Sequence, residues 1–126
     1  MLPKTAKIMV VDDMKMMRTS IRNFLNGLGY EKVIEAVDGK DAVEKHAMEE
    51  PKFIFMDVVM PNLSGNEALK LIRDADRTVP VVMLTSVSDE TLMQECQKLG
   101  ITGYILKPLT RDNGPQTLAR MLDKVS

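Results

Sequence analysis

Acidic side chains directly follow two apolar runs of this sequence. Asp12 and Asp13 come after KIMVV, and Asp57 comes after FIFM and before Val-Val-Met and Pro61. A carboxylate beside buried strand residues costs free energy unless its charge is hydrogen-bonded or paired. We therefore interpret the three acids as candidate functional groups.

Polar residues also follow two later apolar runs. Thr85 and Ser86 come after VVML, and Lys107 with Pro108 comes after GYIL. Hydroxyl and ammonium groups can donate hydrogen bonds to anionic oxygens. Asp38, which follows the run KVIEA, instead suits the cap of a helix.

The apolar runs alternate with stretches of helical spacing, such as Met17, Ile21 and Phe24. We expect strands at 7–11, 32–36, 53–56, 81–84 and 103–106. Helices should begin near Asp38, Ser64 and Ser88 or Asp89, and should end near Gly27, Gly29 and Gly100. Alternating strands and helices predict an α/β fold with a five-stranded parallel sheet that is covered on both faces.

In such a sheet, ligands bind beyond the carboxyl ends of the strands, where the strand order reverses. In the common order 2-1-3-4-5, this point lies between strands one and three, so Asp12, Asp13 and Asp57 should meet. Three carboxylates with one ammonium, that of Lys107, leave a formal charge of about -2, which a divalent cation would neutralise. Oxygen-only ligands suit Mg²⁺.

The same residues suit phosphoryl chemistry. A carboxylate such as that of Asp57 can act as nucleophile when a metal and a cation screen the incoming oxygens. Lys107 would supply the positive charge and Thr85 a hydroxyl donor, while Ser86 is small enough to leave the approach open. We expect Asp57 to be the residue that becomes phosphorylated.

The composition limits the functions that this chain could have. It has 126 residues, enough for one domain, with 44% apolar and 28% charged residues and a net charge of -1. That balance gives no electrostatic reason to expect direct nucleic-acid binding. Cys96 is the single cysteine, and no apolar stretch reaches the roughly 18 to 20 residues of a membrane span. We expect a cytoplasmic domain without membrane insertion.

These residues together resemble the receiver domain of two-component response regulators. The likeness rests on Asp12-Asp13, on Asp57 in FMDVVMPNLSG, on Thr85-Ser86 and on Lys107-Pro108, and it covers essentially the whole chain, 1–126. The run DDMKMMRTSIRNFLNGLGY and the lack of an output domain are most similar to single-domain chemotaxis regulators. The resemblance implies a flavodoxin-like three-layer (βα)5 sandwich and a cis Lys107-Pro108 bond.

The resemblance also implies roles for the site residues. Asp57 would accept a phosphoryl group from a sensor histidine kinase, with Asp12, Asp13, Asp57 and the backbone carbonyl of Val59 around Mg²⁺. Thr85 and Tyr104 would act as the switch. The face made by the fourth helix, fifth strand and fifth helix would then bind an output protein, the flagellar switch in chemotaxis. We expect a monomer that is not an enzyme but assists its own phosphorylation and dephosphorylation.

Some residues depart from the family pattern. Val59 is apolar and cannot orient an attacking water, so we expect no help from its side chain in dephosphorylation. Leu109 replaces a frequent Phe. Asn113-Gly114 favours a turn and Pro115 fits the first position of a helix, so the fifth helix should begin late.

Each candidate residue also has a simpler interpretation. Asp12 and Asp13 could cap the first helix, Asp57 could be a turn acid, Lys107 a solvated surface residue, and Tyr104 part of the core or of its rim. Two other functions also remain open: a phosphatase of the haloacid dehalogenase type with an aspartyl nucleophile, and a binding module that is never phosphorylated. The chain could also be a receiver domain cut from a longer regulator.

Outside the site, we expect little chemistry. In the segment 39–49, only Ala42, Val43 and Ala47 form an apolar face, so we expect His46 to be solvated. Cys96 should be buried as a small apolar residue, whereas Met14 and Met16 could be exposed enough to touch a partner.

Overall fold

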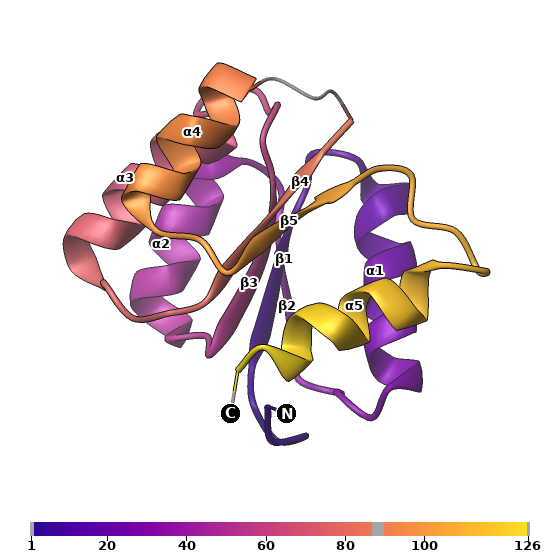
Figure 1. The fold of residues 1–126 in the computed structure, drawn as a ribbon. Helices are drawn as coiled ribbons and strands as arrows, with labels where there is room; N and C mark the ends of the chain where they lie inside the picture. The colour runs from indigo at the N-terminus through magenta and orange to yellow at the C-terminus, as the bar shows by residue number, and fades with distance from the viewer. Residues whose placement is uncertain (1, 87–89, 126) are drawn as a thin grey trace.

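The computed structural model describes residues 2–86 and 90–125, and there it shows strands alternating with helices (Figure 1). The strands are β1 (Ile8–Val11), β2 (Val33–Ala36), β3 (Phe53–Asp57), β4 (Val81–Thr85) and β5 (Gly103–Leu106). The helices are α1 (Lys15–Gly27), α2 (Gly39–Glu49), α3 (Gly65–Ala75), α4 (Glu90–Leu99) and α5 (Gly114–Asp123). The predicted alternation is confirmed.

The strands form one parallel sheet in the order β2-β1-β3-β4-β5, as expected for a flavodoxin-like fold. In the middle of the sheet, Met9 of β1 is in register with Ile34 of β2 and with Ile54 of β3. The chain leaves β1 toward one face of the sheet and β3 toward the other. The carboxyl ends of β1 and β3 therefore lie at the point where the strand order reverses.

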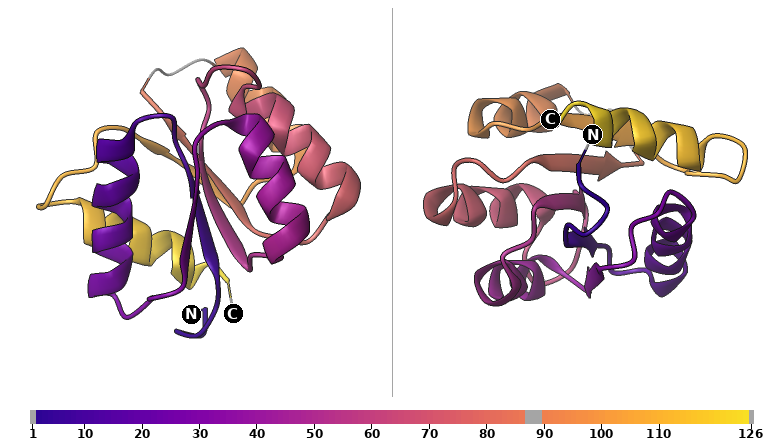
Figure 2. Two further views of the ribbon diagram at one scale, coloured as in Figure 1. Left: turned by 180° about the vertical axis from the view of Figure 1, so that it is seen from behind. Right: turned by 90° about the horizontal axis from the view of Figure 1, so that it is seen from below.

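Successive strand residues point to opposite faces of the sheet and build two apolar cores. Phe53 and Phe55 pack on the face covered by α1 and α5, with their ring centroids 4.9 Å apart. Ile54 and Met56 pack on the other face, which α2, α3 and α4 cover (Figure 2). Cys96 is fully buried there, as predicted. Because both faces are covered, the strands are apolar along almost their whole length.

Several predicted helix starts are confirmed by their caps. The Asp38 carboxylate accepts a hydrogen bond from the Asp41 N–H at 2.7 Å, at the start of α2. Ser64 and Glu67 form a reciprocal capping box at the start of α3. The turn before Pro115 starts α5 late, as expected. The expected start of α4 at Ser88 or Asp89 lies outside the described residues.

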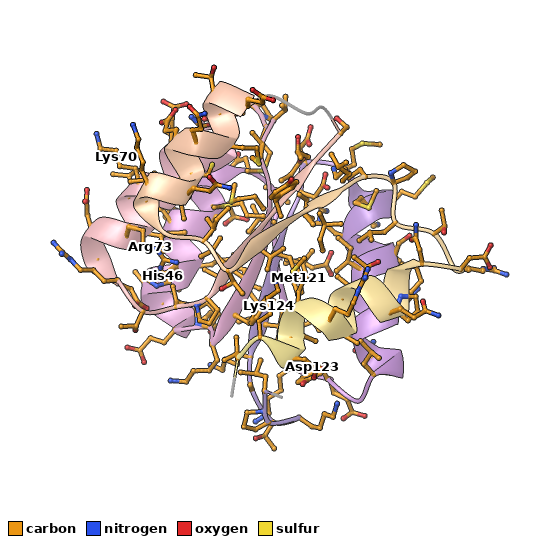
Figure 3. All side chains as sticks on the ribbon, viewed as in Figure 1. His46, Lys70, Arg73, Met121, Asp123 and Lys124 are labelled. Atoms are coloured by element: carbon orange, nitrogen blue, oxygen red, sulfur yellow. The ribbon has the colours of Figure 1, made fainter. Side chains whose placement is uncertain are left out.

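The buried face of α2 differs from the prediction. His46 is buried, with 8% of its surface exposed, whereas Ala47 is exposed. The His46 Nε2 atom lies 3.2 Å from the Asp76 Oδ2 atom in the loop after α3. Figure 3 shows His46 and Arg73 on the α2–α3 side of the sheet. The prediction that His46 is solvated is therefore wrong. Helical spacing could not reveal its partner, which is 30 residues away in the sequence.

Element boundaries also differ slightly from the expectation. β3 includes Asp57 and β4 includes Thr85, so both polar residues belong to strands and not to the loops that follow. Helix α5 ends at Asp123, and Val125 packs against the core from outside the helix. None of the helices in residues 2–86 and 90–125 has the length and apolar character that a bilayer crossing requires.

Candidate functional site

Three acids meet at the carboxyl end of β1 and β3. Asp12 is fully buried, Asp57 is 6% exposed, and Asp13 is exposed to solvent. One carboxylate oxygen from each residue lies within 4.8 Å of the others. The predicted convergence of Asp12, Asp13 and Asp57 is confirmed, so they form one cluster and are not separate surface acids.

Lys107 brings a positive charge into this cluster from the end of β5. Its Nζ atom lies 2.7 Å from Asp12 Oδ2 and 3.1 Å from Asp57 Oδ2, and only 11% of its side chain is exposed. The Lys107 N–H donates to the Thr85 carbonyl at 2.8 Å, and the Lys107-Pro108 bond is cis, as predicted. Lys107 is therefore not a solvated surface residue.

The charges in the cluster do not balance. Burial raises the pKa of Asp57, and the negative charges of Asp12 and Asp13 add to this rise, which Lys107 only partly opposes. Burial by itself lowers the pKa of Lys107, but its hydrogen bonds and charge interactions with Asp12 and Asp57 outweigh that effect and raise it. Lys107 therefore stays protonated, while the acids keep an excess of negative charge.

The site contains the donor set that Mg²⁺ prefers. Its candidate ligands are carboxylate oxygens, with two of the three acids buried and one facing solvent, where coordinated water can remain. Burial and excess negative charge together raise the pKa of Asp57, and a divalent cation would compensate the excess charge. Asp12, Asp13 and Asp57 thus fit a magnesium ion by charge, by donor type and by proximity.

Hydrogen bonds hold Asp12 on three sides. Its Oδ1 atom accepts from the Met14 N–H at 2.9 Å, its Oδ2 atom accepts from Lys107, and its backbone carbonyl accepts from Arg18 Nη1 at 2.7 Å. Arg18 was not predicted as a site residue. It lies on the side of α1 that faces the sheet, and no sequence motif distinguishes it from Arg22, which follows on the same helix.

Gly65 was also not predicted as a site residue, because its position on the apolar face of a helix already accounted for a small residue there. A Cβ atom on Gly65 would lie 2.1 Å from the carbonyl oxygen of Asp57, closer than atoms can pack. The Gly65 N–H donates to the Val58 carbonyl at 2.8 Å. The start of α3 therefore closes directly against the end of β3 and holds the backbone of Asp57 in place.

The other predicted site residues surround this cluster. Thr85 ends the neighbouring strand and is 3% exposed, whereas Ser86 is exposed. Val59 lies in the loop after β3 with 69% of its surface exposed, and Tyr104 on β5 is 46% exposed. Met14 and Met16 are exposed, as expected.

The comparisons with known proteins agree with this geometry. The sequence profile of the response regulator receiver domain matches residues 8–119. The chain is 37% identical to chemotaxis protein CheY1 of Helicobacter pylori over 122 residues, which covers 94% of this chain and 95% of that protein. It is 30% identical to chemotaxis protein CheY of Thermotoga maritima over 120 residues, covering 95% and 97% of the two chains.

Solved structures show the same fold. CheY4 of Vibrio cholerae superposes with a TM-score of 0.86 at 33% identity, covering 97% of this chain and 99% of that one. A CheY of Borrelia burgdorferi, solved as a CheX-CheY-BeF3-Mg complex, gives a TM-score of 0.85 at 25% identity over 94% and 87% of the chains. The chain belongs to the response regulator receiver domain family and resembles its CheY members.

Proposed function

We propose that this chain is a phosphorylation-dependent signalling switch whose phosphoacceptor is Asp57. One observation carries the proposal: Asp57 is a nearly buried carboxylate with an ammonium 3.1 Å away and two further acids within 4.8 Å. A purely structural acid would have its charge balanced by its neighbours. Here the negative charge exceeds what Lys107 compensates, and the pKa of Asp57 is raised.

In the proposed reaction, an Asp57 carboxylate oxygen attacks the phosphorus of a phosphohistidine on a sensor kinase. The new bond joins phosphorus to oxygen, and the phosphorus–nitrogen bond breaks, which returns the electron pair to the imidazole. Bound Mg²⁺, held by Asp12, Asp13, Asp57 and the backbone carbonyl of Val59, would supply positive charge for the phosphoryl oxygens. The Lys107 ammonium would hold the phosphoryl group, and the Thr85 hydroxyl would donate a hydrogen bond to it. The small side chain of Ser86 would leave room for the phosphoryl group to approach.

The switch would pass from the site to the face formed by α4, β5 and α5. Tyr104 and Leu106 of β5 are 46% and 54% exposed on this edge of the sheet. We expect Thr85 to move toward the phosphoryl group and Tyr104 to turn inward, which changes that face through a population shift. A shift from about 1% to 99% active needs ~5.5 kcal/mol, more than the ~1.5 to 3 kcal/mol of one charge-assisted hydrogen bond. Lys107, the cation and the output partner would share that free energy.

The pathway is part of the same proposal. The similar proteins of Helicobacter pylori and Thermotoga maritima are named chemotaxis proteins. This supports a chemotactic role, in which residues 1–126 would work in the cytoplasm as a single monomeric receiver domain. A histidine kinase would donate the phosphoryl group, and the flagellar switch would be the output partner. The Borrelia burgdorferi CheY was solved in a complex that contains Mg, which supports the proposed cofactor.

The proposal is tested by mass spectrometry of the intact protein. Incubation with acetyl phosphate and Mg²⁺ should add one phosphoryl group, and Asp57→Asn should abolish this gain because the nucleophile is lost. Asp74→Asn is the matched control, since Asp74 is an exposed acid on α3. A phosphoryl group that persists in the Asp57→Asn variant, or that is absent without any substitution, would refute the proposal.

A further inference from the structure

Arg18 joins the acid cluster to the edge of the sheet. Its Nη1 atom donates to the backbone carbonyl of Asp12 at 2.7 Å, and its Nε atom lies 3.1 Å from Glu35 Oε1 on β2. The side chain of Arg18 is only 11% exposed. One guanidinium therefore bridges a candidate metal ligand and the edge strand.

The next arginine on the same face of α1 provides a natural comparison. Arg22 Nη1 lies 3.0 Å from Glu35 Oε2, and Arg22 Nη2 donates to the Val33 carbonyl at 2.7 Å. Both arginines thus bind the same carboxylate and attach α1 to β2. The bonds that Arg22 makes are to β2, whereas Arg18 also binds Asp12.

The Asp12 carbonyl lies just beyond the last hydrogen bond that the end of β1 makes to the sheet. β1 ends at Val11, and the Asp12 N–H makes a sheet hydrogen bond to the Ala36 carbonyl at 3.2 Å. The Asp12 carbonyl points to Arg18, which takes the place of a further strand residue. The peptide groups on both sides of the Asp12 Cα atom are therefore held, and the direction of its side chain with them.

We infer that Arg18 is a positioning residue for the cation site: through the backbone carbonyl of Asp12, it orients the carboxylate that would bind Mg²⁺. This inference rests on the proposed function, since it concerns the same cation site. Groups that orient metal ligands commonly change metal affinity by a factor of about 10 or more when they are removed.

Charge alone would have the opposite effect. A positive side chain near a cation site repels the cation, so removal of that charge strengthens cation binding. A positioning role predicts that the loss of Arg18 weakens cation binding. The sign of the change in Mg²⁺ affinity therefore separates the two roles.

The test measures Mg²⁺ binding without a phosphodonor, by isothermal titration calorimetry and by the chemical shifts of the Asp12, Asp13 and Asp57 amides. Arg18→Met should weaken Mg²⁺ binding about tenfold. Arg18→Lys keeps the charge but cannot bridge the Asp12 carbonyl and Glu35 in the same way, so it should also weaken binding. Arg22→Met loses contacts to the same Glu35 and should bind Mg²⁺ like the unmodified chain.

Urea denaturation of the metal-free proteins controls for stability, because both Met variants lose a bond to Glu35 and should both be destabilised. Unchanged or tighter Mg²⁺ binding by Arg18→Met would overturn the inference, as would an equal loss in Arg22→Met. If Arg18→Met does not fold, Arg18→Lys decides by the same criterion. If the unmodified chain binds no Mg²⁺, the proposed cation site fails together with this inference. If it binds Mg²⁺ and the Arg18 variants bind equally well, only this inference fails.

Discussion

Asp57 and Asp76 lie at opposite ends of the same sheet, and their surroundings shift their pKa values in opposite directions. Burial and neighbouring acids raise the pKa of Asp57. Partial burial would raise that of Asp76 too, but hydrogen bonds from Thr78, Val79 and His46 lower it to about 2. Oδ1 of Asp76 accepts from the Thr78 N–H at 2.9 Å, the Thr78 hydroxyl at 3.0 Å and the Val79 N–H at 3.0 Å.

The difference lies in how the protein uses the two negative charges. At the amino end of the sheet, donors satisfy the Asp76 carboxylate, so its ionisation stabilises the turn into β4 and the contact with α2. At the carboxyl end, burial disfavours the ionisation of Asp57, and the negative charges of Asp12 and Asp13 add to this effect, which Lys107 only partly opposes. An acid that is costly to ionise in the metal-free protein suits a site whose cation and phosphoryl group come from outside.

The largest effect should come from removing the ammonium of Lys107, which pairs with the carboxylates of Asp12 and Asp57. Lys107→Met would leave Asp12 and Asp57 buried without their ammonium partner, which costs about 3 to 5 kcal/mol for a broken buried pair. Urea denaturation at pH 7 without divalent ions measures this loss. Added Mg²⁺ should restore part of the stability, because it would replace some of the missing positive charge.

Lys7→Met is the matched control for Lys107→Met. Lys7 Nζ lies 3.9 Å from Glu49 Oε2, and both side chains are more than 40% exposed. Such surface pairs contribute about 0 to 1 kcal/mol. Equal destabilisation by the two substitutions would contradict the idea that burial of the cluster sets its energetics.

At the other end of the sheet, Asp76→Ala should destabilise the protein by about 2 kcal/mol, because the buried His46 and the donors of the turn before β4 lose their partner. The pKa of Asp76 is below its ordinary 3.8, so its contribution is present above pH 3.8 and is lost as the pH falls toward 2. The difference between the two proteins should therefore shrink with acid. Asp74→Ala, an exposed change on α3, should leave stability unchanged. A difference for Asp76→Ala that stays constant between pH 6 and roughly pH 2 would be inconsistent with this assignment.

Asp57→Asn should change stability in the opposite direction to Asp76→Ala, and by a smaller amount. The folded pKa of Asp57 is above its ordinary 3.8, so stability falls as rising pH ionises the group. The amide removes that charge and should stabilise the metal-free protein at pH 7, by less than the stability that Asp76→Ala loses. Below the unfolded pKa, both proteins carry a neutral group and the gain should vanish. Thermal denaturation at several pH values measures it, and a loss of stability at pH 7 would show that the Asp57 charge is compensated.

The smallest effect concerns Val59, in the loop that follows β3 beside the acid cluster. Val59 is exposed and apolar, so its side chain cannot orient water toward a phosphoryl group on Asp57. Val59→Asn should shorten the phosphoryl lifetime about threefold, ~0.6 kcal/mol in activation free energy. Loss of the added mass with time after removal of phosphodonor measures this rate. Faster decay in the unmodified protein than in the variant would show that Val59 does not slow hydrolysis.

Much of the site could be predicted from the sequence. Asp12, Asp57, Thr85 and Lys107 each lie at or just after the carboxyl end of a recognisable strand, and parallel strands bring these ends to one side of the sheet. The caps at Asp38 and Ser64 were predictable too, because a cap depends on residues three apart. In these cases the decisive interactions are local or follow from the alternation of strands and helices.

The pairings that set the electrostatics were decided only by the tertiary structure. Arg18 binds the Asp12 carbonyl and Glu35 of another strand, and His46 is buried because Asp76 approaches it from a distant loop. A helical pattern places Arg18 and Arg22 on the same face and His46 among polar residues, but it says nothing of the groups opposite. Side-chain periodicity indicates the buried face of an element where that face is apolar, whereas the charges that meet there depend on contacts between elements far apart in the chain.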